Sequence, residues 1–250
     1  MHVPEYTPPE LDSDLDPMAL PFSFDLDGGA RTTGILYAAA AAAAPPMLAL
    51  AHGAGADQRH RFMVAVAEGL SARGFDVVTF NFLYMEQRRR TPDRTDALES
   101  CWRRAIDAVE MRARGPLFLG GKSMGGRIAS QVAAQPRDRP PADDERRRTR
   151  VAGLVFLGYP LHPPGKPSQL RDKHLPAVPA PMLFVQGARD AFGTPDELAP
   201  VVARCASATV HVVADADHSF AVPKRSGRSE SHVVGEILEA VSSWIRSRTR

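Results

Sequence analysis

After residue 46 the chain alternates between two patterns of hydrophobic and polar residues. The first consists of short runs of Val, Leu, Ile and Phe that are apolar at consecutive positions, which is typical of strands buried on both faces. These runs are MLALAHGAG from Met47, DVVTFNF from Asp76, PLFLGG from Pro116, VAGLVFLGYP from Val151, PMLFVQGARD from Pro181 and ATVHVVADAD from Ala208. Each predicts one buried strand.

The second pattern places apolar residues three or four positions apart, which predicts amphipathic helices. We expect these helices at residues 61–74, 95–115, 125–135, 195–206 and 231–247. Glycines at the end of the first two, and Pro136 after the third, are typical helix stops. Buried strands that alternate with helices predict an α/β fold, in which helices cover both faces of a mostly parallel central sheet.

The N-terminal part follows neither pattern. Residues 1–20 are acidic and rich in proline, so we expect an irregular arm. Residues 21–37, PFSFDLDGGARTTGILY, alternate around Gly28-Gly29 and predict an antiparallel hairpin at one edge of the sheet. The alanines at 38–44 end at two prolines, which favours a slack connection over a helix. Residues 21–250 are expected to form a single domain, in which 136–150 is a charged loop.

The segment GGKSMGGR, residues 120–127, permits two interpretations. Its Gly-Lys-Ser resembles the end of a phosphate-binding loop, which requires a further glycine at position 116. That position is Pro116, and the PLFL run is expected to be strand, so no loop remains to surround a phosphate. The nucleotide-binding interpretation is therefore disfavoured.

The same segment matches Gly-x-Ser-x-Gly from Gly121 to Gly125, between a predicted strand and a predicted helix. A serine on so sharp a turn has a strained backbone, and the two glycines avoid collisions around it. The helix that begins there directs its N-terminal dipole at a developing oxyanion. Ser123 is thus a candidate nucleophile; an inert serine in a glycine-rich turn is the alternative.

A serine nucleophile needs a general base and a group that orients the base. Asp190 follows the carboxyl end of one predicted strand, and His218 follows the next. Because active sites of open α/β sheets lie at these ends, the side chains are expected to converge on Ser123. We predict His218 as the base and Asp190 as its partner. Asp215 and Asp217 are the alternative partners, although loop formation is their simpler role.

The segment AHGAG, residues 51–55, follows the first central strand, where small residues let the backbone approach a substrate oxygen. The backbone N–H groups of Ala54 and Met124 are the predicted oxyanion-hole donors, and Gly55 is expected to border the substrate. His52 is expected to brace this loop rather than react. A simple glycine turn is the alternative interpretation.

Composition narrows the classes of function. A net charge of +2 is too small to indicate a polyanionic partner, and the basic run 87–94 has no aromatic residues among its arginines. The longest apolar run is too short and too interrupted by proline to span a membrane. The N-terminus lacks the features of a signal peptide, and the two cysteines have no metal-ligand spacing. We therefore expect a cytoplasmic protein without nucleic acid, membrane, metal or cofactor.

Several segments together resemble α/β-hydrolases of the group that contains testis-expressed protein 30 and subunit 3 of the nonspecific-lethal chromatin complex. They are LAHGAGAD, GGKSMGGR, FLGYPLHPPGKP, LFVQGARDAFG and DADHSF. The bacterial members of this group are related to dienelactone hydrolases. The resemblance covers residues 22–247 and implies the α/β-hydrolase fold with Ser123, Asp190 and His218 as its triad. The alanine tract and loop 136–150 depart from the pattern, as surface insertions would.

Residues 158–181 lie where many α/β-hydrolases insert a lid domain, but this segment is short and rich in proline. No lid domain is therefore expected, and the site should be shallow or open. Tyr159, His162 and Lys166 are predicted to line its mouth, with Lys166 meeting an anionic group. Prolines that merely stiffen the connection are the alternative.

Two functions follow from these observations. The first is a metal-free serine hydrolase that cleaves a small carboxylic ester or thioester through an acyl-enzyme. The second is a catalytically idle protein of the same fold that acts in protein–protein interaction. The complete triad favours the first, because a scaffold has no need of a strained elbow. The expected partner is a small acyl substrate, and the chain is expected to be a monomer or a small homo-oligomer.

Overall fold

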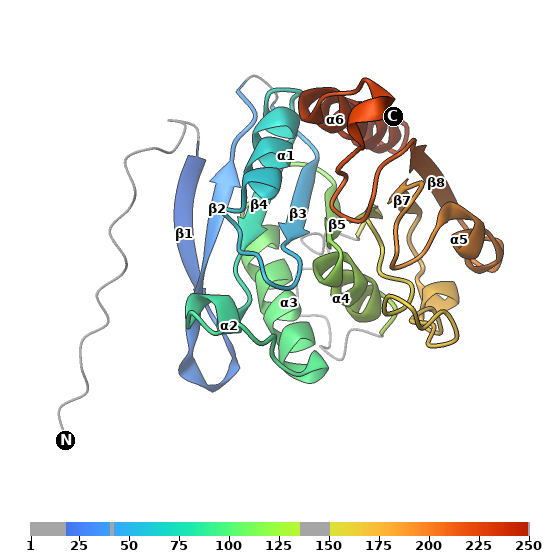
Figure 1. Ribbon diagram of the computed structural model, residues 1–250. Helices are drawn as coiled ribbons and strands as arrows, with labels where there is room; N and C mark the ends of the chain where they lie inside the picture. Colours follow the sequence, from blue (N-terminus) through green and yellow to red (C-terminus); the bar gives the residue numbers. More distant parts are fainter. Residues whose placement is uncertain (1–18, 41–42, 136–150, 250) are drawn as a thin grey trace.

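The computed structural model describes residues 19–40, 43–135 and 151–249, and these residues build one eight-stranded sheet between helices (Figure 1). The strands are β1 (Ala19–Asp25), β2 (Arg31–Tyr37), β3 (Met47–Ala51), β4 (Asp76–Phe80), β5 (Leu117–Lys122), β6 (Gly153–Leu157), β7 (Met182–Gly187) and β8 (Ala208–Val213). Their order across the sheet is β1-β2-β4-β3-β5-β6-β7-β8. All neighbouring pairs from β4 to β8 are parallel, which confirms the predicted, mostly parallel sheet.

The first two strands form the predicted antiparallel hairpin at one edge of the sheet. The chain reverses at η1 (Asp27–Gly29), where Gly28 and Gly29 have φ angles of 79° and 81° that favour glycine. β2 also pairs antiparallel with β4, which joins the hairpin to the parallel part. Ala19 and Leu20, which the sequence assigns to the arm, belong to β1. The rest of the predicted arm lies outside the described residues.

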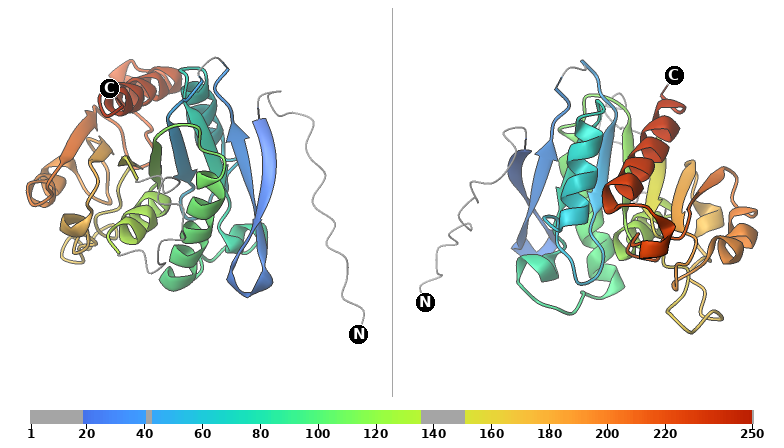
Figure 2. Two further views of the ribbon diagram at one scale, coloured as in Figure 1. Left: turned by 180° about the vertical axis from the view of Figure 1, so that it is seen from behind. Right: turned by 45° about the horizontal axis from the view of Figure 1, so that its top comes forward.

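Helices cover both faces of the sheet (Figures 1 and 2). They are α1 (Arg61–Ser71), α2 (Leu83–Glu86), α3 (Thr95–Glu110), α4 (Met124–Ala133), α5 (Pro195–Val202) and α6 (Glu230–Arg246). The buried residues of α1 and α6 share one hydrophobic cluster, and those of α3, α4 and α5 share the other. The sheet therefore separates two cores, as the predicted fold requires.

The central strand β3 shows why both faces are covered. Met47, Ala49 and Ala51 pack into the core beneath α3 and α4, whereas Leu48 and Leu50 pack into the core beneath α1 and α6. Successive side chains of a strand point to opposite faces. A strand that is apolar at every position therefore needs a layer of helices on each side.

The structure differs from the predicted elements mainly at their ends. α3 stops at Glu110, before its predicted end at residue 115. The helix α2 was not predicted, because four residues are too few to show a helical period. β8 forms the far edge of the sheet and is only partly buried, unlike the central strands. Residues 38–40 and 43–44 of the alanine tract form no helix, as expected. Residues 41–42 and the predicted loop 136–150 lie outside the described residues.

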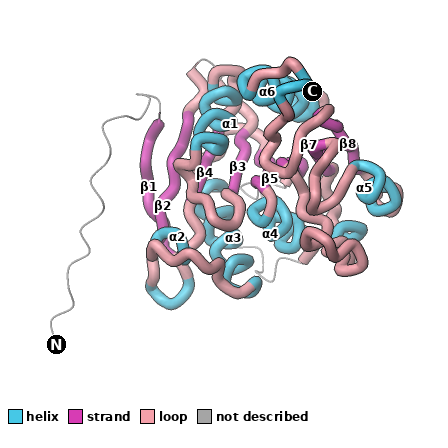
Figure 3. Tube along the Cα trace, in the orientation of Figure 1, coloured by secondary structure: helices cyan, strands magenta, loops and turns pink. Residues whose placement is uncertain are grey.

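The connection from residue 158 to 181 contains one element only, the short turn η2 (Leu175–Ala177), and is otherwise loop (Figure 3). It is too small to form a lid domain, which agrees with the sequence. Among the residues that the structure describes, no helix has both the length and the apolar character that crossing a membrane requires.

Candidate active site

Ser123 lies on a sharp turn between β5 and α4. Its φ of 50° and ψ of −115° form a backbone conformation that residues with a side chain rarely adopt. Because α4 begins at Met124, the N–H end of the helix lies directly beside this serine. The structure thus has the strand, turn and helix that the sequence predicts for a nucleophile elbow.

Two glycines make room for this turn. A Cβ on Gly121 would lie 2.5 Å from the carbonyl carbon of Gly125. A Cβ on Gly125 would lie 2.4 Å from the carbonyl oxygen of Ala51. Both distances are shorter than non-bonded atoms allow in a packed interior. The Gly-x-Ser-x-Gly spacing is therefore a steric requirement of packing α4 against β5 and β3.

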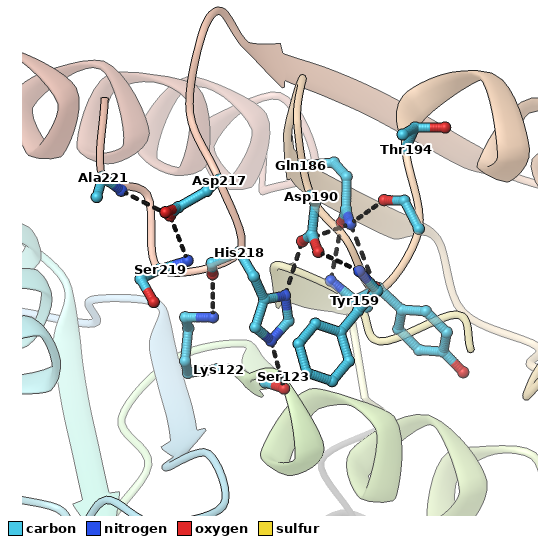
Figure 4. A network of polar contacts seen from close by, with 12 residues as sticks. Lys122, Ser123, Tyr159, Gln186, Asp190, Thr194, Asp217, His218, Ser219 and Ala221 are labelled. Carbon is cyan, nitrogen blue, oxygen red and sulfur yellow. Dashed lines mark hydrogen bonds and ion pairs between the residues drawn. The ribbon is translucent and has the colours of Figure 1, made fainter. Parts of the chain in front are cut away.

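Ser123, His218 and Asp190 form one chain of polar contacts (Figure 4). The Nε2 atom of His218 lies 2.8 Å from Ser123 Oγ, and its Nδ1 atom lies 2.7 Å from Asp190 Oδ2. Asp190 follows β7 and His218 follows β8, as the sequence predicts. In this arrangement Nε2 is placed to accept the serine proton while Nδ1–H donates to the carboxylate.

Asp190 is buried, and both of its carboxylate oxygens accept hydrogen bonds. Oδ1 accepts the backbone N–H of Phe192 at 2.8 Å. Oδ2 accepts the side-chain amide of Gln186 at 2.9 Å in addition to its contact with His218. A buried carboxylate is costly unless such donors replace its hydration. These contacts therefore compensate the charge and fix the orientation of the carboxylate.

Sequence reasoning missed Gln186 and Phe192, which contact Asp190 and His218. Gln186 is fully buried, and its amide also donates to the carbonyl oxygen of Gly193 at 2.7 Å. A polar residue at the end of the apolar run MLFVQ was the signal that could have revealed it. The ring of Phe192 stacks on the imidazole of His218, with centroids 4.1 Å apart. Nothing in the sequence distinguishes this phenylalanine from those of the core.

The alternative partners of His218 take the simpler role that the sequence allows. Asp217 Oδ1 accepts the backbone N–H groups of Ser219 and Ala221 at 2.8 and 3.0 Å (Figure 4). Asp215 occupies a left-handed turn position with a φ of 59°. These contacts shape the loop that carries the histidine, while Asp190 contacts its ring.

The predicted oxyanion loop packs against the nucleophile turn. A Cβ on Gly53 would lie 3.5 Å from Ser123 Cβ, so the two backbones are in close contact. Ala54 and Gly55 follow and are exposed, and Gly55 has a φ of 76°. The backbones of Ala54 and Met124 thus belong to two segments that border the serine. Their role as donors stays a prediction.

His52 braces this loop. It is fully buried, its Nε2 accepts the backbone N–H of Phe82 at 3.1 Å, and its Nδ1 lies 2.8 Å from the carbonyl oxygen of Gly53. Because Nε2 is the acceptor, the proton resides on Nδ1. Burial lowers the pKa of His52 to about 4. The residue is therefore a neutral structural contact, as expected.

The three side chains predicted to line the mouth of the site differ in their exposure to solvent. Tyr159 has no exposed surface and its hydroxyl donates to the carbonyl oxygen of Arg171 at 2.7 Å, so the expectation that it lines a mouth is wrong. His162 is also buried, and its Nε2 lies 3.3 Å from the carboxylate of Glu197. Lys166 is exposed. The ring of Tyr159 lies in the core, where Phe156 and apolar residues of the following loop surround it.

Among the described residues, no group of three or more His, Cys, Asp or Glu side chains is arranged to hold a metal ion. Cys101 is buried and Cys205 half-buried, and neither forms a disulfide.

Comparison with known proteins places this geometry in a familiar fold. A lidless α/β serine hydrolase from Xanthomonas campestris superposes with a TM-score of 0.68 at 18% identity, covering 92% of this chain and 96% of that chain. A dienelactone hydrolase from Anabaena variabilis gives a TM-score of 0.66 at 20% identity, covering 93% and 100%. Est1E from Butyrivibrio proteoclasticus, solved with ferulic acid, gives 0.69 at 13% identity, covering 91% and 98%.

These identities are low, so the solved structures show the shared fold alone. The family comparison goes further, because residues 44–246 match the family model described as an alpha/beta hydrolase domain. The matched segment includes the turn at Ser123, the loop at residues 51–55, Asp190 and His218. The chain therefore belongs to the α/β-hydrolase domain family.

Proposed function

We propose that the chain is a serine hydrolase that cleaves a small carboxylic ester or thioester. The observation that carries the proposal is the chain of contacts from Asp190 through His218 to Ser123, at 2.7 and 2.8 Å. The strained φ of 50° at Ser123 and the membership of the α/β-hydrolase family support the same activity. A strained turn costs free energy, which a purely structural loop has no reason to spend.

In the proposed first step, Ser123 Oγ attacks the carbonyl carbon while His218 Nε2 takes its proton. Asp190 holds the Nδ1–H tautomer and stabilises the imidazolium. The backbone N–H groups of Ala54 and Met124 donate to the oxyanion. The tetrahedral intermediate then expels the alcohol or thiol, which receives the proton from His218, and Ser123 remains acylated.

The second step hydrolyses the acyl-enzyme. His218 Nε2 removes a proton from water, and the hydroxide attacks the acyl carbon. The new tetrahedral intermediate expels Ser123 Oγ, which recovers its proton from His218, and the carboxylic acid leaves. The cycle is complete with the chain's own residues, and we propose that no cofactor takes part.

The proposed substrate is small because residues 158–181 contain only one short turn and form no lid. An open site cannot enclose a long acyl chain, so it favours short or exposed acyl groups. Gly55 and Lys166 are the predicted substrate contacts that reach the surface, and Lys166 is proposed to meet an anionic group. A bound ligand in a deep, closed tunnel would contradict this part of the proposal.

A fluorophosphonate probe tests the activated nucleophile directly. We expect an adduct on Ser123, located by mass spectrometry, in the wild-type protein. The adduct should be absent from His218→Ala, in which the serine is present but has no base. A folded wild-type protein without adduct would instead favour the idle, interaction-only function. The resemblance to the testis-expressed protein 30 group, the cytoplasmic location and the monomer or small homo-oligomer likewise stay predictions.

A further inference from the structure

Lys122 precedes the proposed nucleophile and reaches the same histidine. Its Nζ donates to the backbone carbonyl oxygen of His218 at 2.6 Å (Figure 4). The next residue, Ser123, meets the imidazole ring of His218 at 2.8 Å. Two consecutive residues at the end of β5 therefore hold one histidine at two points, its main chain and its ring.

The ammonium group occupies space that Gly158 leaves open. This glycine follows β6 with a φ of 70°, and a Cβ there would lie 3.1 Å from Lys122 Nζ. The same Cβ would lie 3.3 Å from the carbonyl oxygen of His218 and 3.5 Å from Asp190 Oδ2. Lysine, histidine backbone and aspartate thus meet at one point, where a larger residue than glycine would separate them.

The surroundings of the ammonium group combine low hydration with negative charge. Burial lowers the pKa of Lys122 to about 8, while the charges of Asp190 and Asp217 act in the opposite direction. The ring of Phe220 lies 5.4 Å from Nζ, within the range of a cation–π contact. Removing an ammonium group from water is costly unless it is paired, so the His218 carbonyl and the nearby carboxylates stabilise the group in this position.

Two main-chain hydrogen bonds of the loop that carries His218 lie within the loop or join it to the end of β7. The N–H of Asp217 donates to Ala221 within the loop, and the N–H of Arg189, beyond β7, donates to the carbonyl oxygen of Ala216. Neither contact involves the strand that supplies the nucleophile. Lys122 links the main chain of this loop to β5.

We propose that Lys122 is a positioning residue, which fixes the backbone of His218 relative to β5 and thereby sets the distance from His218 Nε2 to Ser123 Oγ. This inference rests on the proposed function, since it assigns Lys122 a part in the same triad. Lys122 donates through its ammonium group to the loop and takes no proton in the reaction.

Kinetic comparison of three variants tests this role. Lys122→Met keeps the length of the side chain but has no donor. Because a misplacement of about 1 Å can cost roughly 100-fold in rate, we expect maximal fluorophosphonate labelling and p-nitrophenyl acetate turnover to fall roughly 10- to 100-fold. KM should change less than about threefold, because the ammonium contacts the loop and not the substrate. Lys122→Gln, which retains a donor, should recover part of the rate, and the exposed control Lys173→Met should match the wild type.

A spectroscopic measurement tests the geometry without turnover. The proton shared by His218 Nδ1 and Asp190 gives a low-field NMR signal. We expect this signal to shift or broaden in Lys122→Met and, to a lesser degree, in Lys122→Gln, whose amide still donates but is shorter. It should be unchanged in Lys173→Met. Lys122→Gln keeps a polar side chain at this position, so it tests the contact even if Lys122→Met does not fold.

The outcomes separate the two proposals. A wild-type protein that shows the low-field signal but no labelling would contradict the serine-hydrolase function and leave the NMR comparison to decide on Lys122. If both Lys122→Met and Lys122→Gln are labelled as fast as the wild type and show an unchanged NMR signal, the positioning role is overturned. A reduced rate with a changed signal, partly restored by Lys122→Gln, would support it.

Discussion

Gly125 packs so closely against Ala51 that a Cβ on the glycine would lie 2.4 Å from the carbonyl oxygen of the alanine. This contact brings the first turn of α4 against the carboxyl end of β3. The nucleophile turn and the loop that follows Ala51 thereby share one wall, with Gly53 beside Ser123. The proposed oxyanion donors depend on this close approach, since they come from the two segments that the contact joins.

Replacement of Gly125 by alanine should therefore separate α4 from β3. We expect the free energy of unfolding to fall by about 1–3 kcal/mol, which is the usual cost of overpacking. Labelling of Ser123 by a fluorophosphonate should slow as well. Gly235 is the matched control, because it lies in α6 with nothing within 4 Å of its Cβ position. Gly235→Ala should gain about 0.5–1 kcal/mol in chemical denaturation, and a similar gain for Gly125→Ala would contradict the packing argument.

The orienting carboxylate can be identified by two matched substitutions. Asp190→Asn keeps the shape of the side chain but presents an amide to His218 Nδ1, which favours the wrong tautomer of the imidazole. We expect esterase kcat to fall by roughly 10³-fold or more. Asp217→Asn keeps an oxygen that can accept the N–H groups of Ser219 and Ala221, so it should cost far less. An equal loss in both variants would reopen the choice between the two carboxylates.

Gln186 should matter for both stability and rate. Gln186→Leu removes the donor to Asp190 Oδ2 and leaves the buried carbonyl oxygen of Gly193 without that partner. Each unsatisfied buried group costs about 1–3 kcal/mol, so we expect an unfolding free energy lower by about 2 kcal/mol or more. Turnover should fall through kcat, because the carboxylate loses a fixed orientation. The exposed control Gln169→Leu should change neither quantity, and an equal kcat in Gln186→Leu would remove Gln186 from the positioning network.

The proximity of Ser123, His218 and Asp190, the proposed triad, could be predicted from sequence because these residues obey a rule of position. Asp190 and His218 each follow a strand of a parallel sheet, and Ser123 follows β5, so the topology alone brings them to one edge. Tyr159 follows β6 in the same way, yet its ring packs between Phe156 and the neighbouring strand. Position after a strand does not determine which way a side chain turns.

The contact between β5 and the loop that carries His218 could not be predicted from the sequence, for a different reason. Lys122 and His218 are 96 residues apart, and their contact depends on the open space that Gly158 leaves between them. The hydrophobic pattern carries no information on such space. In the sequence, Lys122 and the residues beside it resemble the end of a phosphate-binding loop, whereas the contact with His218 exists only in the folded chain.

Acid should destabilise the fold before most carboxylates titrate. Burial lowers the pKa values of His52 and His174 to about 4, with Arg127 contributing at His174. In the unfolded chain these groups bind protons near their model value of 6.5, so the unfolded state binds more protons between pH 6.5 and 4. We expect the free energy of unfolding to be unaffected by these groups above this window and to decrease as pH falls through it. The slope approaches about 1.4 kcal/mol per pH unit for each histidine.

Urea denaturation at several pH values from neutral to acid measures this slope. His52→Gln retains a donor and an acceptor for Gly53 and Phe82 but does not titrate. Its unfolding free energy should therefore decrease less steeply with falling pH than that of the wild type. Identical slopes would mean that His52 takes up its proton equally well in the folded and unfolded chain, which contradicts its burial as a neutral brace.

Alkaline pH should have the opposite effect through Lys122. Its pKa in the folded chain is lowered to about 8, whereas the unfolded chain holds the proton up to the model value of 10.5. Between these values the unfolded state binds more protons, so stability rises with pH by at most about 1.4 kcal/mol per unit. Other groups also titrate in this range, and the difference in unfolding free energy between wild type and Lys122→Met removes their contribution. We expect this difference to shift in favour of the wild type as pH rises above 8; a constant difference would mean that the contacts of the ammonium group with the His218 carbonyl and the nearby carboxylates fully offset its burial, so that its pKa is the same in the folded and unfolded chain.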